Sequence, residues 1–555
     1  MLSVLKRSWF PVAAVLWILS TSAVCRTQDT VATYPVRGVV LNSITHRPIA
    51  RALVNGQEDA VLTDNDGRFE LNLSEGTTQI LVKRPGFGAN RIGMVRAHSV
   101  KVGANMPELT FYLTPDATIT GHVLVAGGED ADQIRVIAMH KQVFNGHAIW
   151  QWQGMHMTDS EGMFHIENVE APGSYLLCTQ VSQDEWAPAA SAKTTYGYPA
   201  TCYPGVTDLS AAGSVTVSPG QQVEVEFPLT RQPFYPVSIG VSNHAHGQPA
   251  GVMIREASGH GGSGIIPRWN ATLNTTEVNL PNGHYTAEIN VRGKTSSYGR
   301  LDFQVAGGPV LGLSLVESPL RPIQVEIQKE FTGDKNGVVQ TVGLGGSAGD
   351  TGPGMNMSLV PLDSNTFQSG GAVQAVPGSA DHNLFEMNDV APGTYRVQTF
   401  AFQGYVASIR SGAVDLARDP LVVGAGDTTP PIEVTLRDDG GSIRGTVRTG
   451  ALGSSVPGQD VGETSMVYAY AIPQFANPAQ IPMSVSSGGS AVVFGNLAPG
   501  PYRVVAFDQP QEIDMEDQQA LARLTGGGQT VTVEAGGTAT VQLDMVKTAG
   551  EEGTR

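Results

Sequence analysis

The sequence has few charged side chains, few cysteines and no long apolar run beyond its first residues. Charged residues make up 15% of the 555 residues, and acidic side chains outnumber basic ones to give a net charge of −17. Because a nucleic-acid-binding surface needs a basic face, this balance excludes nucleic acid as the expected partner. Long amphipathic helical patterns are also missing, whereas Gly (66) and Pro (34) are abundant. Such a composition is typical of many short strands joined by turns.

The N-terminal segment has the pattern of an export signal. Lys6 and Arg7 precede a short apolar run over 10–19, and small residues follow at 21–23. The run is shorter than the roughly 20 residues that a membrane-spanning helix needs. We therefore predict a signal peptide over 1–25 and no transmembrane segment in the mature chain. The mature protein is expected in the periplasm, at the cell surface or outside the cell, where disulfides can form.

A strand–turn–strand pattern recurs along the chain. Its copies end in Ala171-Pro-Gly-Ser-Tyr175, Ala391-Pro-Gly-Thr-Tyr395 and Ala498-Pro-Gly-Pro-Tyr502, with a weaker copy at Pro281-Asn-Gly-His-Tyr285. Pro presets one backbone dihedral of the turn, Gly accepts the positive φ that usually follows, and the Tyr begins a strand whose alternate residues face a core. A recurring hairpin in so long a chain predicts a tandem array of similar β domains.

The first unit carries a pattern that resembles a known family. It combines Val36-Arg-Gly-Val-Val40, Ile44-Thr-His-Arg-Pro-Ile49 and Thr63-Asp-Asn-Asp-Gly-Arg-Phe69. Together these stretches resemble the carboxypeptidase regulatory-like domain, a transthyretin-like β-sandwich that occurs beside peptidases, in outer-membrane receptors and in secreted bacterial multidomain proteins. The resemblance covers this unit well and the later ones in part. It implies no catalysis, because in peptidases this domain is an accessory to a catalytic domain.

We therefore predict an all-β fold, a tandem array of transthyretin-like or Ig-like β-sandwich domains. About five sandwiches are expected, the first of them carboxypeptidase regulatory-like and the third divergent, between the signal peptide and a disordered tail. The predicted boundaries are 1–25, 34–114, 115–231, 232–318, 319–437, 438–546 and 547–555. The linkers are very short, which favours a semi-rigid rod over domains on flexible tethers.

Two stretches that begin at Thr63 and Thr158 resemble the start of a calcium-binding loop. The downstream Glu of an EF-hand is missing from the first, and a strand follows at once. A hairpin turn explains both stretches, with the Asp side chain capping its own backbone. His244, His246 and His260 could supply metal ligands, but they stand in Gly/Ser-rich surroundings without a matching carboxylate motif. We predict no metal and no other cofactor.

Cys178 and Cys202 are the cysteines expected in the mature chain if cleavage follows Cys25. Both fall in the second unit of an exported protein, so a disulfide between them is plausible. Tyr175 and Leu177 are the inward residues of their strand, so Cys178 points outward and the loop carrying Cys202 has to fold over that face. Two free cysteines are the alternative, and neither has the neighbouring His–acid pattern of a nucleophile.

The second unit also contains a group of aromatic residues. Trp150 and Trp152 share one face of a strand, with amide side chains on the other. Flat rings flanked by amides suit stacking on sugars, so the candidate binding residues are Trp150, Trp152, His156, Trp186 and Tyr198. The alternative is that the tryptophans belong to the sandwich core, because large aromatics dominate small cores.

The sequence lacks the common catalytic motifs, including the P-loop, the dinucleotide fingerprint and His-Glu-x-x-His. We therefore predict that the protein is not an enzyme. It is expected to be a cell-envelope or extracellular scaffold that presents loops to an unknown protein partner. The alternative is a carbohydrate-binding protein with an aromatic platform in its second domain, since the transthyretin-like fold is structurally similar to starch-binding modules. A hydrolase with a dispersed site in the third or fourth unit is a third hypothesis.

Overall fold

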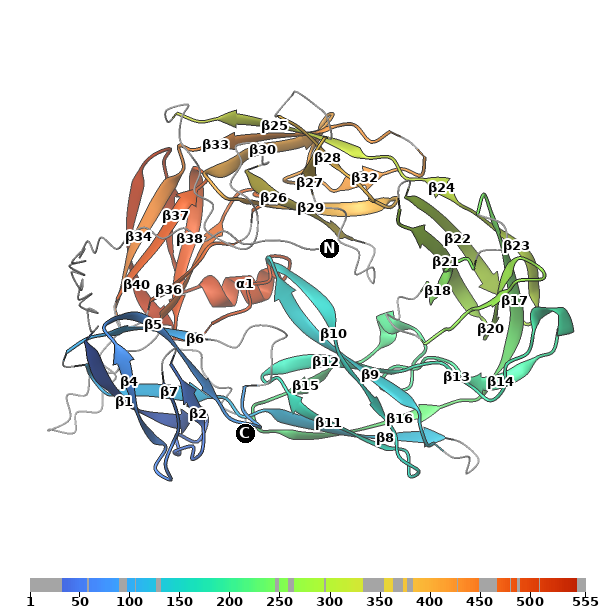
Figure 1. Ribbon diagram of the computed structural model, residues 1–555, viewed down its shortest axis with the longest axis horizontal. Helices are drawn as coiled ribbons and strands as arrows, with labels where there is room; N and C mark the ends of the chain where they lie inside the picture. Colours follow the sequence, from blue (N-terminus) through green and yellow to red (C-terminus); the bar gives the residue numbers. More distant parts are fainter. Residues whose placement is uncertain are drawn as a thin grey trace, which may run out of the picture.

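The computed structural model describes residues 32–56, 59–88, 97–104, 106–125, 131–244, 249–257, 264–293, 296–332, 354–362, 373–376, 383–426, 428–448, 467–479, 481–486, 490–508 and 510–546. The predicted signal peptide and C-terminal tail lie outside these ranges. The described residues form strands joined by turns, and α1 (Gln518–Thr525) is the α-helix among them. The predicted all-β array of sandwiches is confirmed (Figure 1).

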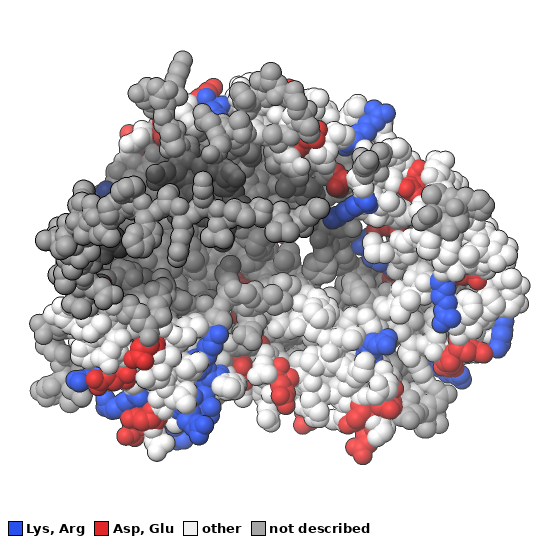
Figure 2. Space-filling view, viewed as in Figure 1, with Lys and Arg blue, Asp and Glu red and all other residues white. Residues whose placement is uncertain are grey.

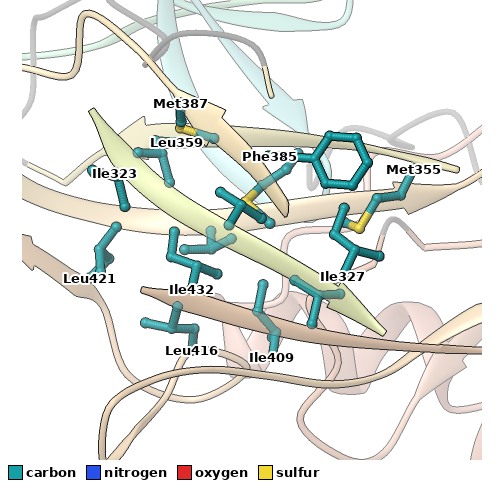
Figure 3. Packing of buried hydrophobic residues seen from close by; sticks show 14 of the residues in the cluster. Ile323, Ile327, Met355, Leu359, Phe385, Met387, Ile409, Leu416, Leu421 and Ile432 are labelled. Carbon is teal, nitrogen blue, oxygen red and sulfur yellow. The ribbon is translucent and has the colours of Figure 1, made fainter. Parts of the chain in front are cut away.

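Five hydrophobic cores follow one another along the chain. Their buried members span 36–111, 117–229, 237–315, 323–436 and 443–543. Each core forms because alternate residues of a strand point to the same face, as in β25 (Ile323–Glu330), where Ile323 and Ile327 are buried and their neighbours exposed. In the fourth core these side chains pack among Phe385 and Ile409 of other strands (Figure 3).

The first strand of each unit has a parallel neighbour at or near the end of the same unit. Parallel pairing needs a long crossover, and the rest of the unit supplies it. The pairs are β1 (Thr33–Asn42) with β7 (Leu109–Leu113), β8 (Ala117–Val125) with β16 (Gln222–Leu229), β17 (Gln232–Ser242) with β23 (Val310–Val316), β25 with β33 (Ile432–Arg437), and β34 (Gly441–Arg448) with β40 (Thr538–Val546).

The remaining strands of the first three units complete their sheets. The first unit has β2 (Leu53–Asn55), β3 (Ala60–Leu62), β4 (Arg68–Ser74), β5 (Gly76–Lys83) and β6 (Ala97–Val102). The second has β9 (Arg135–Phe144), β10 (His147–Met157), β11 (Met163–Val169), β12 (Gly173–Thr179) and β15 (Val215–Val217), whereas its β13 (Ser182–Gln183) and β14 (Thr195–Tyr198) join the sheet of the third unit. The third has β18 (Met253–Glu256), β19 (Arg268–Asn270), β20 (Thr275–Leu280), β21 (Gly283–Val291), β22 (Ser297–Val305) and β24 (Ser318–Pro319).

The last two units are built in the same way. The fourth has β26 (Met355–Pro361), β27 (Val373–Ala375), β28 (Leu384–Met387), β29 (Gly393–Ala401), β30 (Tyr405–Ser411), β31 (Val414–Asp415) and β32 (Leu421–Val423). The fifth has β35 (Val467–Pro473), β36 (Met483–Ser486), β37 (Ala491–Leu497), β38 (Gly500–Phe507) and β39 (Gln529–Val533).

The recurring Pro-Gly stretch does not close the predicted hairpin, because β11 and β12 lie in different sheets, as do β28 and β29. The turn is stabilised by the tyrosine that follows it. Each of these tyrosine rings is buried, and its hydroxyl donates back to a carbonyl just before the turn. The bonds run from Tyr175 to Glu170 (2.7 Å), Tyr285 to Pro281 (3.0 Å), Tyr395 to Ala391 (2.7 Å) and Tyr502 to Ala498 (2.9 Å). The motif therefore combines a buried ring with a hydrogen bond that satisfies a turn carbonyl.

The two Thr-Asp-x-x-Gly stretches are turns built on an Asp side chain, as predicted, but the predicted hairpins are wrong. The strands that each turn joins, β3 with β4 and β10 with β11, belong to different sheets. Asp64 Oδ1 accepts from the backbone N–H groups of Asp66 and Arg68, at 2.9 and 2.8 Å. Asp159 makes the same pair of bonds, at 3.0 and 2.9 Å. The glycine of each turn, Gly67 or Gly162, adopts a left-handed φ of 72° or 78°.

The units do not form the predicted rod. The linkers are short, since β7 ends at Leu113 and β8 begins at Ala117. Even so, the chain curves back on itself, and the β9–β10 hairpin of the second unit points toward β29 and α1 (Figure 1). Asn145 at its tip donates a 2.8 Å bond to Gln398 of the fourth unit. Short linkers limit freedom at each joint, but they do not set the angle of the joint.

Candidate functional site

Trp150 and Trp152 lie on β10, the edge strand of the sheet ordered β10-β9-β12-β15. They stand opposite Lys141 and Met139, whereas the alternate residue Ala138 belongs to the second core. Both tryptophans are therefore on the outer face of the sheet, and neither is a member of the sandwich core. Trp150 is half-buried against a small outer cluster, and Trp152 is 48% exposed.

A β-bulge extends the apolar surface of β10 beyond the tryptophans. The register shifts between Trp152 and Gly154, so that Met155 then pairs with Ile137 on the outer face. Met155 and Met157 are exposed, and with the two tryptophans they form what we call the β10 stripe: Trp150, Trp152, Met155 and Met157. Simple alternation along the sequence would have put the methionines on the opposite face.

The same bulge moves His156 off the β10 stripe. His156 pairs with Val136, a residue of the second core, so it lies on the face opposite to the tryptophans. Burial lowers the pKa of this imidazole. His156 therefore does not join Trp150 and Trp152 in a single platform.

A disulfide joins Cys178 to Cys202 on the outer face of this sheet. Cys178 packs with Ile137 and Leu176, away from Tyr175 and Leu177 of the core. The loop that carries Cys202 folds over this face and brings further apolar side chains, Val206, Leu209 and Ala212, against the cluster. The bond thus fixes the loop beside Trp150, which packs on the same cluster.

The other two candidates lie elsewhere. Tyr198 is buried in the second core, a placement that removes it from any surface platform. Trp186 is exposed, and the guanidinium of Arg268 lies 4.4 Å from its ring centroid. Trp186 follows β13, and β13 pairs with β14, which in turn pairs with β17 of the third unit. The structure therefore brings together only Trp150 and Trp152 of the five predicted residues.

A polar cleft of about 450 Å³ opens beside the disulfide loop. Its lining includes Thr201, Asp208 and Gln232, and the ten residues that line it contain no aromatic ring. The cleft offers hydrogen-bonding groups but no stacking surface. The polar cleft therefore differs from the β10 stripe, which is apolar.

The histidines considered as metal ligands do not form a described metal site. His244 Nδ1 lies 2.7 Å from Glu317 Oε2, and the Ser297 hydroxyl donates to the same carboxylate. His246 and His260 lie outside the described residues. Across the described ranges, no group of three or more His, Cys, Asp or Glu side chains is placed to hold a metal ion.

Charged side chains are sparse on one face of the molecule. On the face shown in Figure 2, small groups of acidic and basic residues are mixed among large uncharged areas. Within the described part of the chain, no helix has the length and apolar character needed to cross a membrane.

These features define a tandem β-sandwich protein with an exposed apolar edge strand in its second unit. No family model matches the sequence, and no curated protein matches it either. Among solved structures, it is similar to the minor pilin GBS52 of Streptococcus agalactiae, at 14% identity and a TM-score of 0.21 over 35% of this chain and 95% of that one.

Two further solved structures are similar over a longer part of the chain. The RrgB pilus protein of Streptococcus pneumoniae has 9% identity and a TM-score of 0.14 over 78% of this chain and 98% of that one. Two B repeat units of the collagen-binding protein of Staphylococcus aureus have 8% identity and a TM-score of 0.13, covering 72% and 94%. Similarity at this level carries no argument about what this chain binds.

Proposed function

We propose that this chain is an exported scaffold protein, not an enzyme, whose β-sandwiches hold interaction surfaces in fixed relative positions. The observation that carries this proposal is the continuity of β-structure between units. β16 ends at Leu229 and β17 begins at Gln232, and β33 ends at Arg437 while β34 begins at Gly441. Joints of two or three residues restrict the motion of neighbouring domains, whereas long linkers would leave them free.

The second and third units are joined most closely. β13 and β14 of the second unit extend the sheet of the third, in the order β13-β14-β17-β20-β19. Glu277 lies on β20 of this sheet, and its buried carboxylate accepts a 3.0 Å bond from the N–H of Ala189. Gln183 donates a 2.9 Å bond to the carbonyl of Asn279. A shared sheet with buried polar contacts favours a single rigid body over two mobile domains.

The Cys178–Cys202 disulfide supports the proposed location outside the cytoplasm, because structural disulfides persist in oxidising compartments. The first unit is proposed to be a carboxypeptidase regulatory-like domain. In support of this assignment, its Thr63-Asp-x-x-Gly turn is built on the Asp64 side chain. In such a protein the domain contributes structure, and the partner contacts fall to exposed strands and loops.

The experiment is to express the full chain with its own N-terminus in a bacterium, fractionate the cells and label free thiols. We expect the protein outside the cytoplasm with Cys178 and Cys202 protected from labelling. Photo-crosslinking from surface positions of the intact protein should then give one reproducible envelope partner. Recovery in the cytoplasm with both thiols labelled would contradict the proposal.

A second candidate function is carbohydrate binding through the β10 stripe, favoured by the exposure of Trp152. The test is a polysaccharide pull-down with Trp152→Ala, beside the matched control Tyr196→Ala, which removes an exposed ring from another strand. Trp152 is better suited to this test than Trp150, because Trp150 also packs on the disulfide cluster. Loss of binding in the first variant alone supports a glycan site, and equal binding in both rejects it.

A further inference from the structure

The tip of the β9–β10 hairpin extends beyond its own sandwich. The pairing of β9 with β12 ends where His140 meets Tyr175, but β9 continues to Phe144. Residues 141–150 therefore form a two-stranded ribbon without a third strand beside it. An isolated two-stranded ribbon is marginally stable in water, so its order depends on what it contacts.

Polar contacts from this ribbon reach two other units at once. The Asn145 amide donates to Gln398 Oε1 on β29 of the fourth unit, at 2.8 Å. His147 Nδ1 lies 3.2 Å from Oε1 of Glu516 in the fifth unit, and the Arg396 guanidinium of the fourth unit bonds to the same oxygen. The Glu516 carboxylate thus contacts side chains of both the second and the fourth unit.

The ribbon tip also fits closely against the fifth unit. The N–H of Met515 donates a 2.7 Å bond to the carbonyl of Gly146, the buried glycine of the turn. A Cβ added at Gly146 would lie 2.9 Å from Met515 Cγ and 3.1 Å from Ile481 Cδ1. Met515 and Ile481 themselves pack on the second apolar cluster of the fifth unit. The fit therefore requires a residue without a side chain at the tip.

We propose that residues 141–150 act as a clasp, whose docking between the fourth and fifth units holds the chain in its curved form and whose release lets it extend. The hairpin contacts join segments separated by more than 250 residues of sequence, since Asn145 meets Gln398 and His147 meets Glu516. Release would also uncover the outer face of β29, where Gln398 now binds Asn145 of the ribbon. The clasp thus gives the scaffold a closed and an open state.

The first test is Gly146→Ala against the matched control Gly86→Ala, measured by small-angle X-ray scattering and hydrogen exchange on the full chain. Both glycines have a left-handed φ, 83° and 79°, so the backbone cost of alanine is similar. Only Gly146 faces another unit, because nothing lies within 4 Å of a Cβ at Gly86. We expect a larger radius of gyration and about tenfold faster exchange over 141–150 in Gly146→Ala alone.

A second pair of variants keeps the test decisive if Gly146→Ala fails to fold. The Glu516 side chain is 57% exposed, so Glu516→Lys should spare the fold of the fifth unit while it repels Arg396. Glu534→Lys makes the same charge change at another exposed site of that unit. Expansion in Glu516→Lys but not in Glu534→Lys supports the clasp. Scattering and exchange identical to the unmodified chain in Glu516→Lys overturn it.

Discussion

Gly121 on β8 lies directly under the ring of Phe164 on β11, so that a side chain at Gly121 would overlap the ring. The two residues are cross-strand partners, and Phe164 is fully buried. The first unit repeats this arrangement, since a Cβ at Gly38 would lie 2.5 Å from Cζ of its strand partner Phe69. In both units, therefore, the Phe that follows the Thr-Asp turn packs against a glycine on the first strand, although the two residues are far apart in the sequence.

Replacing Gly121 with alanine should destabilise the second unit. The added methyl group forces the Phe164 ring out of its place, and overpacking of this kind costs about 1–3 kcal/mol. Urea unfolding of the full chain, followed by a probe in the second unit, measures the loss. The control is Gly495→Ala on β37, where no atom lies within 4 Å of the new Cβ. Equal stability of both variants would show that Phe164 moves without cost.

Removing the hydroxyl of Tyr395 should weaken the recurring turn. Tyr395→Phe keeps the buried ring but loses the 2.7 Å bond to the Ala391 carbonyl, at a cost of about 1 kcal/mol. Thermal unfolding measures the change. Tyr196→Phe serves as the control, because the Tyr196 ring is exposed and lies under the Arg231 guanidinium. A shift of equal size in the control would argue against a special role for the turn bond.

The docked clasp should loosen as the pH falls. Burial and the positive charge of Arg396 lower the pKa of His147 below its ordinary value of 6.5, against the opposing effect of Glu516 and Asp514. Because the docked pKa is below the released one, docking is fully favoured above the ordinary pKa and loses free energy as the pH drops through the docked value. Hydrogen exchange over 141–150 should therefore accelerate between about pH 7 and 5.

The variant His147→Gln isolates this effect, because Gln keeps a hydrogen-bonding side chain at the position but does not titrate in this range. Its exchange over 141–150 should lose most of the pH dependence. Acceleration of the same size in His147→Gln would assign the effect to other groups.

Removing the disulfide should destabilise the second unit without opening the clasp. The bond closes a loop over a sequence separation of 24, for which chain-entropy arguments give about 3 kcal/mol. Urea unfolding of Cys178→Ala/Cys202→Ala against the oxidised chain measures this difference. Reducing agent should lower the stability of the unmodified chain and leave the double variant unchanged. A response of the double variant to reducing agent would contradict the assignment.

Local turn chemistry could be predicted from the sequence in part. The Thr-Asp-x-x-Gly stretches specify their turns through residues close together in the chain, as the bonds of Asp159 show. In the Pro-Gly copies the predicted positive φ at glycine is wrong for Gly173 and Gly393, because the left-handed residues are Asn168 and Asp389. The all-β array of sandwiches followed from the same local signals. The direction of Cys178 could also be predicted, because it depends only on strand alternation from Tyr175.

The candidate site was harder to predict, because it depends on pairing between distant segments. The bulge after Trp152 arises from the register with β9, and it moves His156 to the other face while it brings Met155 to the outer one. Tyr198 was predicted as a binding residue but is buried, since it packs in the core of the second unit. No short-range pattern indicates that Gly146 meets Met515.

The parallel pairing of the first strand of each unit determines how that unit would carry a mechanical load. In a parallel pair the chain enters one strand and leaves the other at opposite ends, as in β8 and β16. Tension applied through the linkers then pulls the two strands along each other, and their hydrogen bonds are loaded together in shear. Bonds that open one after another would yield at lower force. Each sandwich is thus oriented to resist stretching along the direction in which the chain itself runs.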